Sequence, residues 1–255
     1  MVFIRKKENS VMNEIIQSLF DRKSVRVFTD RPVTAEEKDL ILRAAVQAPT
    51  AGNQQLYTII DVTDQAVKNT LVKTCDNQPF IADAKLVLIF CADCRKWYDA
   101  FRFAGCEPRD PGVGDLALAI SDATIAAQNA VVAAESLGIG SCYIGDIMEN
   151  CEAHRELLHL PKYVFPCCML VFGFPTEQQK NRPKPLRSPM DSIVHENRYH
   201  EMDRAELEAM LDIRVASGNT YGNWIHAFCK RKYNSEFSRE MSRSVGVYLK
   251  DFLHK

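Results

Sequence analysis

Two arginines, a lysine and a serine are crowded into the stretch D-R-K-S-V-R-V-F over 21–28. In an extended conformation Arg22, Ser24 and Arg26 share one face, because successive side chains of a strand alternate. The two valines of the stretch then point into the core. Two guanidinium groups and a hydroxyl facing one place are suited to bind phosphate, whose oxygens a guanidinium matches two at a time. A solvated basic turn paired with nearby acidic residues is the alternative, and this stretch alone favours it.

A second group of cations could add charge to the same place. The run T-E-Q-Q-K-N-R-P-K-P-L-R-S-P over 176–189 is polar, basic and proline-rich, which is typical of a loop or extended arm. Lys184 and Arg187 lie in this arm and are candidates to contact the same phosphate. Without the first cluster, this run too is typical of a solvated loop.

The cysteines are the other residues with potential chemistry. The chain has nine, an odd number scattered through apolar segments, which favours a reducing compartment such as the cytoplasm. Cys91 and Cys94 form a C-x-x-C pair, but no second pair follows at zinc spacing and no histidines accompany it. We therefore predict structural thiols and no metal site. No arrangement of nucleophile, base and carboxylate stands out, so we predict no catalytic side chain.

Helical spacing of apolar residues at 15–20 predicts a helix that leads into the basic stretch. The capping box Thr34–Glu37 predicts a second helix that ends near Gln47. The segment 115–137 is the most apolar helix and stops at Gly138, so it is either the centre of the fold or part of a subunit interface. Further elements are expected as strands at 57–62, 84–92, 141–146 and 165–175, and as helices at 64–73, 204–214 and 235–252. The last two helices are expected to be joined by a glycine- and asparagine-rich segment at 217–223.

The 255 residues suffice for one large domain, or for a compact domain with an appendage. A formal net charge of −1 provides no basic field for a nucleic acid. We find no apolar run long enough to cross a bilayer and no secretory signal, so we expect no membrane partner. Met1 and Met12 are both candidate starts, which makes 1–11 a candidate N-terminal extension. Strands that alternate with helices indicate an α+β or α/β layered fold with a helical C-terminal excursion.

Several of these motifs, in order, resemble the nitroreductase superfamily. R-K-S-V-R-V-F at 22–28 resembles its flavin-phosphate motif, and A-P-T-A-G-N-Q-Q at 48–55 resembles the loop after its second helix. The run 126–145, which ends in Tyr-Ile-Gly, is similar to its central helix and the following strand. P-K-P-L-R-S-P, then V-H-E-N-R-Y at 194–199, resembles the branch of oxygen-insensitive NADPH nitroreductases and NADPH–flavin oxidoreductases. The match extends from about Met12 to 248–254.

The resemblance implies an α+β nitroreductase-like fold, with a central mixed, mainly antiparallel sheet flanked by helices, in an FMN-containing homodimer. It implies an FMN-binding core over 12–200 and a C-terminal helical excursion over 201–255 that contributes to the dimer and the substrate pocket. The residues that it implies for flavin binding are Arg22, Lys23, Ser24, Arg26, Thr50, Gln55, Gln78, Tyr143, Ile144, Gly145, Asp146 and Lys184. Arg187 is added as a candidate for the family's displaced phosphate arginine, because Leu186 occupies that arginine's place.

The implied activity is that of an FMN-dependent NAD(P)H oxidoreductase. It passes a hydride through flavin N5 by a ping-pong route to small-molecule acceptors, which are nitroaromatics, quinones or free flavins. NADPH is the first choice of donor, and NADH stays open because 217–223 contains no arginine. His154 and His195 are expected to be structural or surface residues, since the acceptor can take its proton from water.

Two features keep other functions open. Asp146 replaces the second glycine of the family's Tyr-Ile-Gly-Gly, which places a carboxylate beside the flavin and disfavours a reduced, anionic flavin. The segment 96–114 is suited to a substrate lid, which would fit a specialised flavin enzyme of the reductive dehalogenase or flavin-cleaving type. A non-catalytic flavin-binding role, with the basic patch 229–233 as a protein contact, is the remaining alternative.

Overall fold

The computed structural model describes residues 12–254, so the candidate extension over 1–11 lies outside the described residues. The chain divides into two compact units, one of residues up to Arg182 together with those from Glu240 onward, and one of Pro183–Arg239. The FMN-binding core over 12–200 that the resemblance implies stays a prediction.

The two N-terminal helices form as the sequence predicts. Helix α1 (Glu14–Asp21) begins after Asn13, whose side chain accepts a hydrogen bond from the third following backbone N–H. Helix α2 (Ala35–Val46) begins with the complete capping box of Thr34 and Glu37. Each cap satisfies backbone donors that would otherwise lack partners at the start of a helix.

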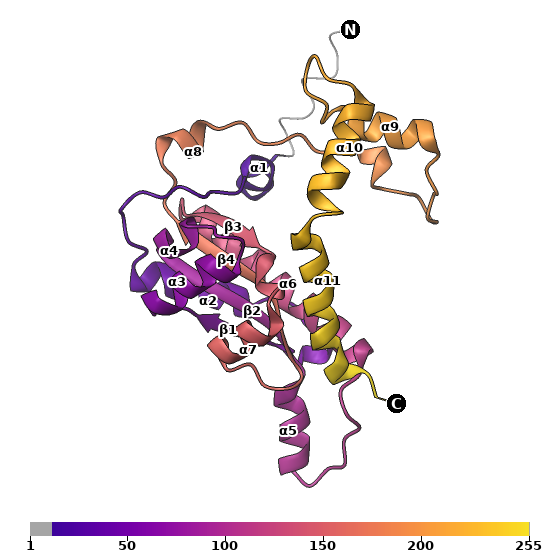
Figure 1. The fold of residues 1–255 in the computed structure, drawn as a ribbon. Helices are drawn as coiled ribbons and strands as arrows, with labels where there is room; N and C mark the ends of the chain where they lie inside the picture. The colour runs from indigo at the N-terminus through magenta and orange to yellow at the C-terminus, as the bar shows by residue number, and fades with distance from the viewer. Residues whose placement is uncertain (1–11, 255) are drawn as a thin grey trace. The chain divides into compact units, whose positions relative to one another are not determined.

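A four-stranded sheet forms the centre of the first unit (Figure 1). Its strands are β1 (Tyr57–Asp61), β2 (Leu86–Asp93), β3 (Gly140–Ile144) and β4 (Val164–Gly173). They lie in the order β1-β2-β4-β3, and every neighbouring pair is antiparallel. A parallel bridge between Ser24 and Ser141 adds the parallel component of the expected mixed sheet. The fold class predicted from the sequence is therefore confirmed.

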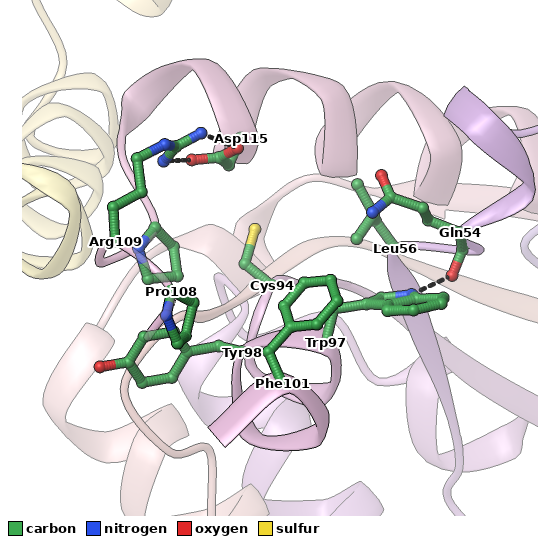
Figure 2. A pocket seen from close by; sticks show the side chains of 10 residues that line it. Gln54, Leu56, Cys94, Trp97, Tyr98, Phe101, Pro108, Arg109 and Asp115 are labelled. Carbon is green, nitrogen blue, oxygen red and sulfur yellow. Dashed lines mark hydrogen bonds and ion pairs between the residues drawn. The ribbon is translucent and has the colours of Figure 1, made fainter. Parts of the chain in front are cut away.

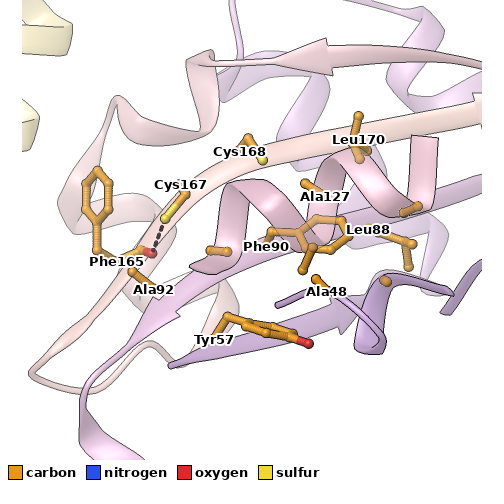
Figure 3. Packing of buried hydrophobic residues seen from close by; sticks show 14 of the residues in the cluster. Ala48, Tyr57, Leu88, Phe90, Ala92, Ala127, Phe165, Cys167, Cys168 and Leu170 are labelled. Carbon is orange, nitrogen blue, oxygen red and sulfur yellow. Dashed lines mark hydrogen bonds between the residues drawn. The ribbon is translucent and has the colours of Figure 1, made fainter. Parts of the chain in front are cut away.

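Each face of the sheet carries its own hydrophobic core. Leu88 and Phe90 of β2 point to a core with helices α2, α6 (Val113–Ser136) and α11 (Glu236–Leu249). Figure 3 shows these two side chains gathered with Ala127 of α6. The intervening residues of β2, such as Ile89, point to a core with α3 (Gln65–Thr74), α4 (Phe80–Asp83) and α7 (Cys151–Leu158). All of β2 and β4 is buried, so no strand face is left for solvent.

Three helices form where loops or linkers were expected. Helix α5 (Arg95–Phe103) occupies the segment considered as a lid, and it projects from the end of β2 away from the sheet (Figure 1). Helix α8 (Glu177–Asn181) forms at the start of the proline-rich arm. In the second unit, α10 (Tyr221–Lys232) begins inside the glycine- and asparagine-rich segment, where Thr220 caps it, and follows α9 (Arg204–Asp212). A side-chain cap thus outweighed the turn-forming composition around it.

One sequence expectation about the most apolar helix is wrong. Among the described residues, α6 is long and apolar enough to cross a membrane by length and composition, contrary to the sequence expectation that no run was. Yet Ala119, Ala123, Ala126 and Ala130 are fully buried against the sheet and neighbouring helices. Small side chains allow that close packing, so α6 is a core helix of the first unit.

Candidate functional site

The basic segment lies in an extended conformation against the edge of the sheet. The backbone N–H of Val25 donates to the carbonyl of Ser141 at 2.9 Å. Two glycines permit this close approach, because a Cβ atom at Gly140 would lie 2.5 Å from Val25 and one at Gly173 would lie 2.6 Å from Phe28. Real Cβ contacts are not that short, so larger residues at these two positions would displace the segment.

Arg22 of the basic segment has a buried nitrogen that the described residues leave without a partner. One of its terminal nitrogens lies 3.4 Å from the hydroxyl of Ser141, and its guanidinium carbon lies 5.9 Å from the centre of the Tyr143 ring. Its Nε atom is buried and has no hydrogen-bond partner among the described residues. A buried donor without a partner is costly, so an acceptor such as a phosphate oxygen would fit beside it.

The alternation of the segment is only partly as expected. Val25 is buried, but Val27 is 46% exposed, so the prediction that both valines enter the core is wrong for Val27. Arg26 extends toward α4, with its guanidinium carbon 5.9 Å from the centre of the Phe80 ring. Only Pro79 separates Phe80 from Gln78, so Arg26 lies near the turn that carries Gln78.

Lys23 and Arg182 join the basic segment to residues 180–182 by hydrogen bonds. The ammonium group of Lys23 donates to the carbonyls of Lys180 and Arg182, both at 2.5 Å. Arg182 in turn donates to the carbonyl of Ser24 at 2.5 Å, while its own Nε is buried without a partner among the described residues. Sequence reasoning missed Arg182, although it lies in the same basic run as Lys184 and Arg187, which were named as phosphate candidates.

Lys184 and Arg187 belong to the second unit. Lys184 is half-buried and Arg187 is exposed. Their assignment to a phosphate therefore stays a prediction.

The loop with Thr50 and Gln55 is held by a residue that sequence reasoning also missed. Asp122 of α6 is 3% exposed, and its two carboxylate oxygens accept from the backbone N–H groups of Ala51 and Leu56, each at 3.1 Å. The hydroxyl of Thr50 accepts from the N–H of Gln55 at 3.2 Å. An aspartate within an apolar helix was the available signal, because a buried carboxylate needs donors that only the fold can supply.

The strand end Tyr143–Asp146 faces both α6 and the turn after α3. The hydroxyl of Tyr143 donates to Gln128 of α6 at 3.2 Å, and burial raises the pKa of this phenol well above its usual value. The side chain of Gln78 donates to the carbonyl of Cys75 at 2.9 Å. Burial, then the charge of Asp146, raises the pKa of the Cys75 thiol to about 12, which places Asp146 near this turn.

The sequence-predicted residues thus fall into two groups within one chain. The first group comprises the basic segment 22–26, the strand end 143–146 and the turn at Gln78. The second comprises the 50–55 loop, whose backbone is bonded to Asp122 of α6. Helix α5 also contacts this loop, because Lys96 donates to the carbonyl of Gln55 at 3.5 Å.

A pocket of about 290 Å³ opens beside the second group (Figure 2). The aromatic rings of α5 form one wall, with the Trp97 and Phe101 ring centres 5.6 Å apart. The indole N–H of Trp97 donates to the carbonyl of Gln54 at 2.7 Å. At the opposite rim Arg109 binds both carboxylate oxygens of Asp115, at 2.5 and 3.0 Å. A pocket with aromatic walls and polar groups at its rims suits a flat organic molecule.

The C-x-x-C pair offers no second chemistry. Burial raises the pKa of Cys91 and of Cys94 to about 12, so both are neutral thiols at physiological pH. A neutral thiol is a poor nucleophile and a poor metal ligand. Among the residues that the structure describes, no group of three or more His, Cys, Asp or Glu side chains is placed to hold a metal ion.

Comparison with known proteins places this geometry in a family. Residues 19–174 match the family model described as "Nitroreductase family". The chain belongs to the nitroreductase family. The matched range contains the basic segment, the 50–55 loop, α6 and the Tyr-Ile-Gly strand end, so the resemblance drawn from these motifs is confirmed.

Characterised members of the nitroreductase family resemble nearly the whole chain. It is 33% identical over 243 residues to an FMN reductase [NAD(P)H] of Bacillus subtilis, covering 93% of this chain and 91% of that protein. It is 36% identical over 206 residues to an oxygen-insensitive NADPH nitroreductase of Salmonella typhimurium, covering 80% and 82%. Among solved structures, the NADPH:FMN oxidoreductase of Vibrio harveyi complexed with NAD+ superposes with a TM-score of 0.79 at 26% identity, covering 93% and 98%.

Proposed function

We propose that the protein is an FMN-dependent NAD(P)H oxidoreductase that reduces nitroaromatics, quinones or free flavins. The observation that carries this proposal is the buried, partnerless Nε of Arg22 in a docked basic segment that matches the family's flavin-phosphate motif. The names of the relatives, which are FMN reductases and NADPH nitroreductases, support the same activity.

The side chains present fit FMN. Arg22, Ser24 and Arg26 would hold the phosphate, while Lys23 and Arg182 keep the segment extended by binding backbone carbonyls. Residues 143–146 and Gln78 would lie along the ring system. A bound FMN supplies the redox chemistry, since its ring accepts a hydride equivalent and returns it. The protein orients the donor and acceptor and limits the access of water.

We further propose that two copies of the chain share each flavin pocket, with the 50–55 loop of one copy completing the site of the other. The resemblance to the nitroreductase superfamily, which implies a flavin pocket shared by both subunits, supports this arrangement. So does the apolar surface of α6 and α2, where Leu118 is 50% exposed, Leu40 is 53% exposed and Ile125 is 40% exposed. Exposed apolar side chains on neighbouring helices are typical of a subunit interface.

The pocket on α5 is our candidate for acceptor recognition. It adjoins the 50–55 loop through the bond between Trp97 and Gln54. Its aromatic walls favour flat acceptors, which describes nitroaromatics, quinones and flavins alike.

The donor is NADPH or NADH, with NADPH preferred because two of the relatives are named for it. In the second unit, Trp224 stacks on Phe228 with ring centres 5.2 Å apart, and Arg231 lies 5.4 Å from the centre of the Phe228 ring. An aromatic and basic surface of this kind could receive a dinucleotide. We propose a cytoplasmic location, which free cysteines support.

Anaerobic titration of the purified protein tests the function. Flavin absorbance is followed while NADPH, and separately NADH, is added, and a quinone is then supplied to the reduced protein. We expect yellow protein that one donor bleaches rapidly and that the quinone restores. Protein that takes up no FMN would contradict the proposal, and FMN that no donor reduces would favour the non-catalytic alternative.

A further inference from the structure

A buried glutamate with one unpartnered carboxyl oxygen lies just after the strand end of β3. Glu149 comes directly after the short helix η3 (Asp146–Met148) and is 5% exposed. Its Oε1 atom is buried and has no hydrogen-bond partner among the described residues. An ionised carboxylate at such a place would be costly, so the group needs a proton or a cation to be stable.

The surroundings of Glu149 are fixed by a network that joins three elements. The backbone N–H of Asn150 donates to Glu240 of α11 at 3.0 Å, and the Asn150 side chain donates to the carbonyl of Thr74 in α3 at 2.8 Å. Ser244 of α11 donates to the carbonyl of Met148 at 2.7 Å. These bonds tie α11, α3 and the segment after β3 together at Glu149. We call this place the acidic junction.

Three further carboxylates act on Glu149, one from each element of the junction. Asp146 belongs to η3, Asp76 to the turn after α3, and Glu240 to α11. Burial first, and then the negative charges of these three groups, raise the pKa of Glu149 to about 7.

The remaining titratable groups of the junction supply no partner for Glu149. Arg243 binds Glu240 and Glu152, so its guanidinium is engaged elsewhere. The two ring nitrogens of His154 contact the Ile147 carbonyl and the Thr74 hydroxyl, and burial lowers the pKa of this imidazole, which keeps it neutral. The thiol of Cys75 is neutral too, because its pKa is raised. The described residues also hold no cluster suited to a metal ion, which leaves the proton.

We propose that Glu149 is a proton-binding site coupled to the cofactor end of β3, so that negative charge gained by the cofactor is accompanied by proton uptake at this carboxyl group. The inference rests on the proposed function, because Asp146, which acts on Glu149, lies in the strand end assigned to the flavin. Glu149 is a positioning residue in this scheme, since it changes the local charge without contacting the reactants.

The charge balance of the step is simple. With FMN bound, loss of a hydride equivalent would convert the nicotinamide donor to NAD(P)+ and would add one negative charge to the cofactor site. Water supplies one proton to the Glu149 carboxylate, which removes one negative charge from the acidic junction. When the acceptor takes the hydride equivalent, Glu149 returns its proton to water. Proton uptake therefore favours reduction, and reduction favours proton uptake, as linkage requires.

The first test asks whether the proton site exists. The carboxyl carbons of glutamate are labelled with 13C in the full-length protein, and their NMR shifts are followed from pH 4 to 9. We expect one resonance, absent from Glu149→Gln, that titrates near neutral pH and moves to lower pH in Asp146→Asn. The exposed Glu156 of α7 is the matched control, and Glu156→Gln should leave that resonance unchanged. A Glu149 resonance that titrates below pH 5 would overturn the proposal.

The second test asks whether the site is coupled to the cofactor. The midpoint potential of the bound flavin is measured between pH 6 and 8 in wild type, Glu149→Gln and Glu156→Gln. A fully linked proton changes the reduction equilibrium tenfold per pH unit, which is about 30 mV for a two-electron couple. We expect the wild type and Glu156→Gln to show a steeper pH dependence than Glu149→Gln, by up to that amount.

The outcomes of the two tests separate the two claims. The coupling would be wrong if Glu149 titrates near neutral pH while the midpoint potentials of wild type and Glu149→Gln depend on pH in the same way. That result would leave FMN binding intact. A protein that binds no FMN would contradict the proposed function, and the coupling would fall with it. If Glu149→Gln does not fold, Asp146→Asn is used alone. In this variant Glu149 should titrate at lower pH, and the pH dependence of the flavin's midpoint potential should shift to lower pH with it. An unchanged midpoint in that variant would overturn the inference.

Discussion

The carboxylate of Asp122 accepts a hydrogen bond from the backbone N–H of Leu56 at 3.1 Å, at a position where the aspartate is almost fully buried. Its other oxygen accepts from Ala51, so a single side chain of α6 fixes both ends of the loop that carries Thr50 and Gln55. A residue of the central helix thus determines the shape of a loop assigned to the cofactor.

Replacing this carboxylate should loosen the loop. In Asp122→Asn an amide N–H2 group faces one of the two backbone donors, so one hydrogen bond is lost and a buried donor remains unpaired. We expect the free energy of unfolding to fall by about 1–3 kcal/mol and FMN retention to weaken, measured by urea denaturation and by flavin content after gel filtration. Asp39→Asn is the control, because its ion pair with Arg43 is exposed and should change stability by less than about 1 kcal/mol. Equal losses in both variants would contradict the role given to Asp122.

Arg22 should contribute to FMN affinity through its unpaired guanidinium nitrogen. Arg22→Lys keeps the charge but loses Nε, so we expect affinity to fall by about 1.5–3 kcal/mol, or roughly 10- to 150-fold. The measurement is fluorescence titration of the flavin-free protein with FMN. Arg43→Lys is the matched control, since Arg43 lies on the exposed side of α2. An unchanged Kd for Arg22→Lys would indicate that the segment is an ordinary basic turn with no role in FMN binding.

Gly140 should not tolerate alanine. The added Cβ would lie 2.5 Å from Val25, so the basic segment must move away from β3. We expect a loss of about 1–3 kcal/mol in the free energy of unfolding, together with weaker FMN binding. Gly246→Ala, inside α11 with no atom within 4 Å of the added Cβ, should instead leave stability unchanged or raise it by about 0.5–1 kcal/mol. Chemical denaturation of both variants decides the matter, and a harmless Gly140→Ala would mean that the segment is not docked as described.

Trp97 should tune acceptor recognition. Trp97→Phe keeps an aromatic wall but loses the bond to Gln54, so the 50–55 loop and the pocket lose one shared constraint worth about 1 kcal/mol. We expect the KM for a flat quinone to rise about fivefold, with little change in kcat. Phe103→Leu, also on α5 but 89% exposed, should leave the KM unchanged. A KM unaffected by Trp97→Phe would remove this pocket from acceptor binding.

The acidic junction should make stability depend on pH. The pKa of Glu149 is raised to about 7 in the folded protein, so the folded state holds a proton that the unfolded state releases above its ordinary pKa of about 4.3. The stabilising contribution is complete below that value and is lost as the pH rises through 7. We expect the free energy of unfolding to fall by roughly 1–3 kcal/mol between pH 5 and 8. In Glu149→Gln the corresponding curve should be flatter, and parallel curves for the two proteins would count against a buried, proton-binding Glu149.

The sequence predicted those features that depend on local spacing. The capping box at Thr34, the apolar runs of β2 and β4, and the alternation that buries Val25 all follow from neighbouring residues. The helix α10 was missed because glycine and asparagine around Tyr221 suggest a turn, whereas the cap at Thr220 starts a helix. Val27 was misplaced because alternation gives only the side to which a residue points, and at this edge nothing covers the valine enough to bury it.

The candidate site was predictable only where a motif carried it. The roles of Asp122 and Arg182 depend on hydrogen bonds to backbone atoms far along the chain. An aspartate within an apolar helix marks Asp122 as unusual, but no local pattern specifies its partners or signals Arg182. Glu149 was even less predictable from the sequence, because it is buried where α3 and α11 meet the segment after β3. Its sequence context, between a methionine and an asparagine, gives no sign of a buried carboxyl group with an unpartnered oxygen.

The return of the chain to the first unit has a consequence for biosynthesis. Residues from Glu240 onward complete that unit, and Tyr248 lies fully buried with its ring centre 5.1 Å from that of Phe165. The ribosome makes this segment after the whole second unit, so the nascent first unit keeps an uncovered apolar surface until the second unit has been made. Folding of the first unit therefore cannot finish before the second unit has been synthesised, and a premature stop near Arg239 would release a chain exposed to aggregation and proteolysis.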